Sequence, residues 1–175
     1  MGQHFIYDKN SNLKVFSVDD FTKENLMEYA SHIEKAIELG IPKIIAHPDT
    51  YMRARDMFEE DETEVAHRIC KVAERYNIPL EINLAQIFNA TYYKGKILNN
   101  DSIEIQKGRL SNVPYPCKEF WQVVSNYNVK VLYGIDVHHK GQISLFSNLV
   151  TLANEIIGGD TISKLNFIAN DEEIW

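Results

Sequence analysis

Apolar positions recur at helical spacing in four segments of the chain, and a short apolar run follows each segment. This spacing predicts amphipathic helices, because residues three or four positions apart share one face of a helix. The four sets are Leu26, Ala30, Ile33 and Ile37; Val65, Ile69, Val72 and Tyr76; Phe120, Trp121, Val124 and Tyr127, opened by Pro116; and Leu145, Leu149, Leu152 and Ile156. Thr22 is the expected N-cap of the first helix, and Gly40 with Pro42 its expected end.

The runs that follow the helices are apolar throughout rather than at every second position. They cover residues 43–46, 80–83, 129–134 and 165–168. Short continuous apolar runs that alternate with helices are typical of a parallel sheet covered by helices, so the pattern predicts an α/β fold. The polar, Asn-rich segment 90–116 interrupts the alternation, and we expect it to form a long loop over the mouth of the sheet.

Polar side chains stand where these predicted strands end. They are His47, Asn83, Asp136 and His138. Ligand sites of parallel α/β folds lie beyond the carboxyl ends of the strands, and a divalent metal needs several convergent nitrogen and oxygen donors. Each residue alone fits a surface or capping role, but the set predicts a metal site. The lack of cysteine donors favours Zn, Mn or Fe over a structural thiolate zinc.

Composition narrows the class of protein. The chain has 175 residues with a formal charge of −7, which predicts one domain over residues 1–175 and argues against nucleic-acid and membrane-surface binding. A small-molecule partner is the expectation. Cys70 and Cys117 form no CxxC motif, so we interpret both as reduced thiols. With no apolar stretch of about 20 residues and no signal pattern at Met1, we expect a cytoplasmic protein.

Five motifs in order carry a resemblance to a known family. They are Gly2-Gln3-His4-Phe5-Ile6, His47-Pro48-Asp49, Leu80-Glu81-Ile82-Asn83, Tyr115-Pro116 before a helix, and Gly134-Ile135-Asp136-Val137-His138. The ordered set resembles the PHP (polymerase and histidinol phosphatase) superfamily, closest to its histidinol-phosphatase-like members. The resemblance extends from residue 2 to about residue 157.

The resemblance implies a partial, distorted TIM-like (β/α)7 barrel that holds two or three divalent metals and hydrolyses a small phosphate monoester. L-histidinol phosphate, an intermediate of histidine biosynthesis, is the substrate expected by default; a phosphotyrosyl or nucleotide substrate is a further alternative. By resemblance, His4 and His47 would share one metal, while Asp136 and His138 would each complete another. A metal-bound hydroxide would then attack phosphorus. The expected supporting residues are Asp49, which would orient an imidazole, together with Glu81, Asn83 and His139.

The chain departs from the family pattern in two respects. The family's H-x-H strand and further His and Glu ligands would lie before Gly2, so the chain corresponds to the C-terminal portion and lacks about half of the expected ligands. The Arg that often follows the E-I-N motif is absent, because residues 84–88 read Leu-Ala-Gln-Ile-Phe. Arg53, Arg55 and Arg109 are the remaining candidates for phosphate binding.

These departures leave a second interpretation open, in which the chain is a non-catalytic PHP fragment that keeps a partial metal site and serves as an interaction or vestigial domain. In either case, strands that would pair with the absent ones expose an open sheet edge. We therefore expect self-association or a partner chain at that edge, unless the N-terminal segment refolds to cover it.

Overall fold

The fold is described from a computed structural model, which covers residues 1–2, 5–7, 13–15, 22–93, 96–97, 110, 112–137 and 140–169. The four predicted helices are present as α1 (Lys23–Glu38), α2 (Glu60–Tyr76), α5 (Lys118–Val124) and α7 (Phe146–Ile157). The Thr22 hydroxyl accepts a hydrogen bond from the Asn25 backbone N–H at 3.4 Å, which confirms the expected N-cap of α1.

The third helix is shorter at both ends than its sequence pattern predicts. Pro116 does not open it, because the Cys117 backbone is extended and its N–H donates to the Asp49 carboxylate instead. Tyr127 lies beyond its end. The Asn126 amide donates to the Gln122 carbonyl at 2.8 Å, and such a side-chain bond competes with continuation of the helix.

The sheet at the centre of the fold consists of parallel strands. β3 (Leu80–Asn83) pairs with β6 (Lys130–Gly134), and β6 pairs with β7 (Asn166–Phe167). Bridges from Ile45 to Leu80 and from Gly2 to Ala46 continue the sheet on the other side of β3. The predicted parallel α/β arrangement is confirmed, and the described part of the sheet is open rather than closed into a barrel.

The run 43–46 was expected to form a full strand, and this expectation is wrong. It makes only the isolated bridges at Ile45 and Ala46. Pro42 and Pro48 flank the run, and proline has no N–H to donate to a ladder, which limits the length of pairing. Along its outer side the Ala46 N–H donates to the Met1 carbonyl at 2.8 Å, so residues 1–2 cover part of the edge that we expected to be open.

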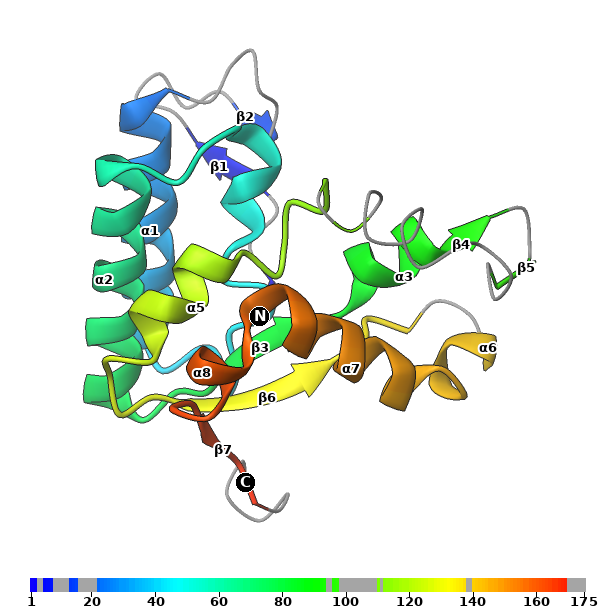
Figure 1. Ribbon diagram of the computed structural model, residues 1–175. Coiled ribbons are helices and arrows are strands. Elements are labelled where there is room, and N and C mark those ends of the chain that lie inside the picture. The colour runs from blue at the N-terminus through cyan, green and yellow to red at the C-terminus, as the bar shows by residue number, and fades with distance from the viewer. Residues whose placement is uncertain are drawn as a thin grey trace.

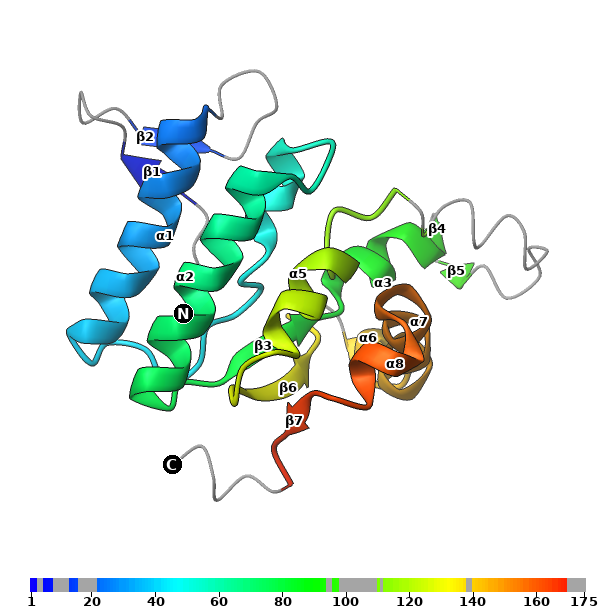
Figure 2. The same cartoon turned by 60° about the vertical axis from the view of Figure 1, so that its left-hand side comes forward.

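Figures 1 and 2 show how the helices are arranged around the sheet. In Figure 2, α1, α2, α5 and α7 follow one another in chain order, and consecutive helices contact each other. The side chains that face them from the strands are fully buried in the core, namely Ile45, Leu80, Ile82 and Val131. Residues on the opposite side of the strands, such as Glu81 and Leu132, are only half-buried. The main core therefore lies between the sheet and one layer of helices.

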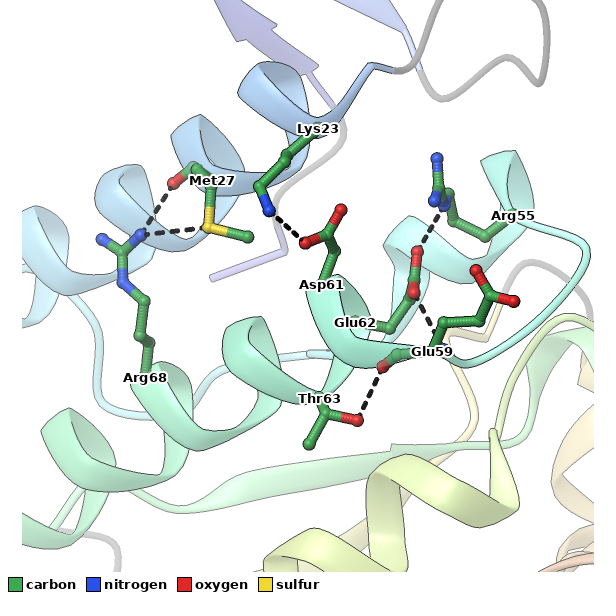
Figure 3. Close-up of polar contacts among 8 residues, drawn as sticks. All are labelled: Lys23, Met27, Arg55, Glu59, Asp61, Glu62, Thr63 and Arg68. Carbon is green, nitrogen blue, oxygen red and sulfur yellow. Dashed lines mark hydrogen bonds and ion pairs between the residues drawn. The ribbon is translucent and has the colours of Figure 1, made fainter.

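Polar contacts hold α1, α2 and the segment between them together (Figure 3). Lys23 on α1 pairs with Asp61 on α2, and the Arg68 guanidinium donates to the Met27 carbonyl at 3.2 Å. Before α2, Arg55 pairs with the fully buried Glu62. Because a buried carboxylate needs a partner, this pair fixes the segment that follows His47 against the start of α2.

The remaining elements are short. They are β1 (Phe5–Tyr7), β2 (Leu13–Val15), the 3-10 helix η1 (Thr50–Ala54), α3 (Ala85–Thr91), β4 (Tyr92–Tyr93), β5 (Lys96–Ile97), α6 (Lys140–Ile143) and α8 (Gly159–Ile162). β1 pairs with β2, and β4 pairs with β5, both antiparallel. The predicted loop 90–116 thus begins inside α3 and contains a strand pair. Residues 94–95, 98–109 and 111 of it lie outside the described part.

Candidate functional site

Three of the predicted site residues stand at the carboxyl ends of neighbouring strands. His47 follows the bridged residues 45–46, Asn83 ends β3, and Asp136 follows the end of β6 by two residues. Two of these ends share an unusual backbone conformation, with φ of 36° at His47 and 48° at Asp136. Positive φ is uncommon outside glycine, so the chain turns sharply at both strand ends.

The Glu81 carboxylate links these strand ends. Its Oε2 atom accepts hydrogen bonds from the His47 backbone N–H at 3.1 Å and from the Asn83 amide at 2.9 Å. Its other oxygen lies over β6, where a Cβ built on Gly134 would come within 1.6 Å of Oε1. Because glycine has no side chain, position 134 leaves room for the Glu81 carboxylate. The role of Glu81 and Asn83 as supporting residues of a metal site stays a prediction.

Burial and neighbouring charges act together on the Glu81 carboxylate. Burial raises the pKa of Glu81 and the negative charge of Asp136 raises it further, while hydrogen bonds from Asn83 and His47 and the positive charge of the Met1 amine lower it. Carboxylate and imidazole groups are the oxygen and nitrogen donors that Zn, Mn and Fe accept, and a divalent cation held by His47 and Asp136 stays a prediction.

Asp49 is fully buried behind the strand end. Its Oδ2 atom accepts hydrogen bonds from the Cys117 backbone N–H at 2.8 Å and from the Trp121 indole N–H at 3.1 Å. Burial raises the pKa of Asp49 to about 7, while the N–H groups of Cys117, Asp49 itself and Trp121 act to lower it. These bonds fasten the start of α5 to the segment after His47, and the expected role of Asp49 in orienting an imidazole stays a prediction.

Tyr115 completes the wall of the site. Its side chain is 5% exposed, and its ring centroid lies 5.9 Å from that of His47. The Gln86 amide, in the first turn of α3, donates to the Tyr115 hydroxyl at 3.3 Å. Gln86 lies within the stretch where an Arg was expected by resemblance, and it presents a neutral donor there.

Two of the arginines expected to bind phosphate, Arg53 and Arg55, line another part of the surface. Arg53 is exposed and Arg55 pairs with Glu62. Both line a cavity of about 1340 Å³ between the segment after η1, the N-terminal end of α5 and the C-terminal half of α7. The lining of this cavity does not include His47, Glu81 or Asp136, so the phosphate-binding role of these arginines stays a prediction.

The other predicted site residues, His4, Arg109, His138 and His139, lie outside the described residues. Within the described ranges, no group of three or more His, Cys, Asp or Glu side chains is placed to hold a metal ion together. The imidazole of His47 and the carboxylate of Asp136 are of the chemical types that bind a divalent cation, and the metal site itself stays a prediction.

Sequence reasoning missed the polar roles of Gln86, Trp121 and the Cys117 backbone. Trp121 was assigned to the apolar face of its helix, where it does lie, and nothing in a helical pattern indicates that its indole N–H reaches a carboxylate distant in sequence. The buried charge of Asp49 directly after a strand was the available signal, because a buried carboxylate requires donors.

None of the helices described is both long and apolar enough to cross a bilayer. Comparison of the chain with models of known protein families, with curated proteins and with solved structures finds no match.

Proposed function

We propose that the chain belongs to a divalent-metal-dependent phosphoesterase of the PHP type that hydrolyses a small phosphate monoester resembling histidinol phosphate. The observation that carries the proposal is the Glu81 carboxylate at the strand ends, bonded to His47 and Asn83 and repelled by Asp136. The order of the strands supports the PHP type of barrel, because residues 1–2, 45–46, β3, β6 and β7 lie side by side in chain order.

The residues that would hold the metals are His47 and Asp136 together with His4 and His138. A bound divalent cation supplies Lewis acidity, which offsets the negative charge on the phosphoryl oxygens. The chain's own contribution is positional. Glu81 holds the His47 backbone, Asn83 holds Glu81, and the Asn83 side-chain oxygen accepts from the Ala85 N–H at 3.0 Å to fix the start of α3.

Hydrolysis of p-nitrophenyl phosphate with Mn²⁺ or Zn²⁺ tests the proposal, with L-histidinol phosphate as the second substrate. We expect Asp136→Asn to lower turnover by a factor of about 100 or more, and EDTA to abolish it. Asp160→Asn, at an exposed carboxylate in α8, is the matched control and should retain turnover within about twofold.

Elemental analysis separates the two interpretations of the chain. Bound metal without turnover would support the non-catalytic PHP fragment. Turnover that Asp136→Asn leaves intact would contradict the site proposed here.

A further inference from the structure

Tyr115 stands beside His47 without a part in the proposed chemistry. The two ring planes are inclined by 36° with centroids 5.9 Å apart, and both side chains are buried, with 5% and 4% of their surfaces exposed. A buried imidazole next to a buried ring has few rotamers open to it, because the ring occupies the space that other rotamers would need.

Contacts on both sides fix the position of Tyr115. On one side Gln86 donates to its hydroxyl. On the other side, Cys117 follows Tyr115 by two residues, and its backbone N–H donates to the Asp49 carboxylate. The same carboxylate oxygen also accepts a hydrogen bond from the Trp121 indole N–H. Asp49 itself follows His47 by two residues. The segment that carries Tyr115 is thus tied to the segment that carries His47 by hydrogen bonds to the buried Asp49 side chain.

We infer that Tyr115 is a positioning residue for His47, and that its aromatic ring, held in place through Asp49, Cys117 and Gln86, fixes the rotamer of the buried imidazole. The consequence for cation binding rests on the proposed function. Residues behind a metal ligand that fix its orientation typically change metal affinity by about 10-fold to 100-fold when they are replaced. The ring, rather than the hydroxyl, carries this role, since the ring is the part that lies beside the imidazole.

The chain provides a matched control for this inference. His67 and Tyr127 form a second His-Tyr pair, with ring centroids 5.8 Å apart and the His67 Nδ1 atom 2.7 Å from the Tyr127 hydroxyl. This pair joins α2 to the segment after α5, away from the strand ends. Tyr115→Leu and Tyr127→Leu therefore make the same substitution beside two different histidines, and Tyr115→Phe keeps the ring.

The experiment has one arm without metal and one with it. In the metal-free arm, the His47 ring signals in carbon-proton NMR spectra, assigned with His47→Asn, should broaden or divide in Tyr115→Leu and stay single in Tyr115→Phe and Tyr127→Leu. In the other arm, Mn²⁺ is titrated by calorimetry. We expect the Kd of Tyr115→Leu to rise by about 10-fold or more, and those of Tyr115→Phe and Tyr127→Leu to stay within about threefold of wild type.

The outcomes distinguish this inference from the proposed function. If the wild-type chain binds Mn²⁺ and Tyr115→Leu binds it equally well, this result overturns the inference and leaves the proposed function standing. Wild type that binds no Mn²⁺ overturns the proposed function, and unchanged His47 signals in Tyr115→Leu then overturn the inference by themselves. If Tyr115→Leu fails to fold, Trp121→Phe removes one of the two bonds to Asp49, and the same broadening of the His47 signals is expected; its absence counts against the inference.

Discussion

Gly134→Ala is the substitution whose effect follows most directly from the structure. A Cβ at this position would come within 1.6 Å of Oε1, 2.5 Å of Cδ and 2.9 Å of Cγ of Glu81. All three atoms belong to the side chain of Glu81, so the substitution must drive the carboxylate away from β6. Gly134 is the last residue of β6 and its φ is not positive, so the alanine is opposed by lack of space rather than by its backbone.

The cost can be estimated from the bonds that Glu81 makes. Its carboxylate accepts from the His47 N–H and the Asn83 amide, and a hydrogen bond to a charged group contributes about 1.5 to 3 kcal/mol. Displacement that weakens both bonds should cost about 2 to 4 kcal/mol. Replacing glycine by alanine in a strand raises the free energy of unfolding by about 0.5 to 1 kcal/mol, because alanine loses less conformational entropy on folding. We therefore expect the free energy of unfolding to fall by about 1 to 3.5 kcal/mol.

Urea denaturation followed by far-ultraviolet circular dichroism measures this change, and a double-mutant cycle with Glu81→Ala tests its cause. Once the Glu81 side chain is shortened, the space above Gly134 is open, and Gly134→Ala should be neutral or stabilise the fold by up to about 1 kcal/mol. Equal losses in the wild-type and Glu81→Ala backgrounds would refute the reasoning, because the clash could not then be the source of the cost.

Three further predictions concern the rest of the fold. Arg55→Ala should lower the free energy of unfolding by about 3 kcal/mol or more, because it leaves the fully buried Glu62 without its cation. Arg53 is exposed, so Arg53→Ala should change the free energy of unfolding by less than about 0.5 kcal/mol, and urea denaturation of both variants checks this. Burial raises the pKa of the Cys117 thiol to about 12 and that of the Cys70 thiol further above its usual value. A thiol reagent at pH 8 should therefore label neither cysteine within minutes in the native chain, and both cysteines in guanidinium. Rapid labelling of the native chain would contradict the burial. Self-association at the sheet edge should appear in sedimentation velocity as a coefficient that rises with concentration, and a constant monomer would count against it.

The sequence pattern predicts the helices and the parallel sheet well, because both depend on apolar periodicity along a single segment. α1, α2, β3 and β6 lie where the apolar residues indicate. The errors fall where a contact from elsewhere in the chain decides the backbone. Asp49 determines where α5 begins, and flanking prolines shorten the run 43–46.

The same distinction applies to the site. The position of His47, Asn83 and Asp136 at strand ends follows from the sequence, since parallel strands end at one edge of a sheet. The bonds between Glu81, His47 and Asn83 do not, because they depend on the register of β3 against its neighbours and on the space above Gly134. A glycine in a strand does indicate a close approach, but not which side chain makes it.

The order of the strands has a consequence for how the chain acquires its shape. The segments of the central sheet lie side by side in chain order, from residues 1–2 through 45–46 and β3 to β6 and β7, while β1 with β2 and β4 with β5 form separate pairs. A nascent chain leaving the ribosome could therefore extend the sheet one strand at a time, with every arriving segment finding its neighbour already in place. Each addition still joins segments that lie far apart in the chain, and such parallel, non-local pairing is slow and leaves apolar segments open to aggregation until the next strand has been added.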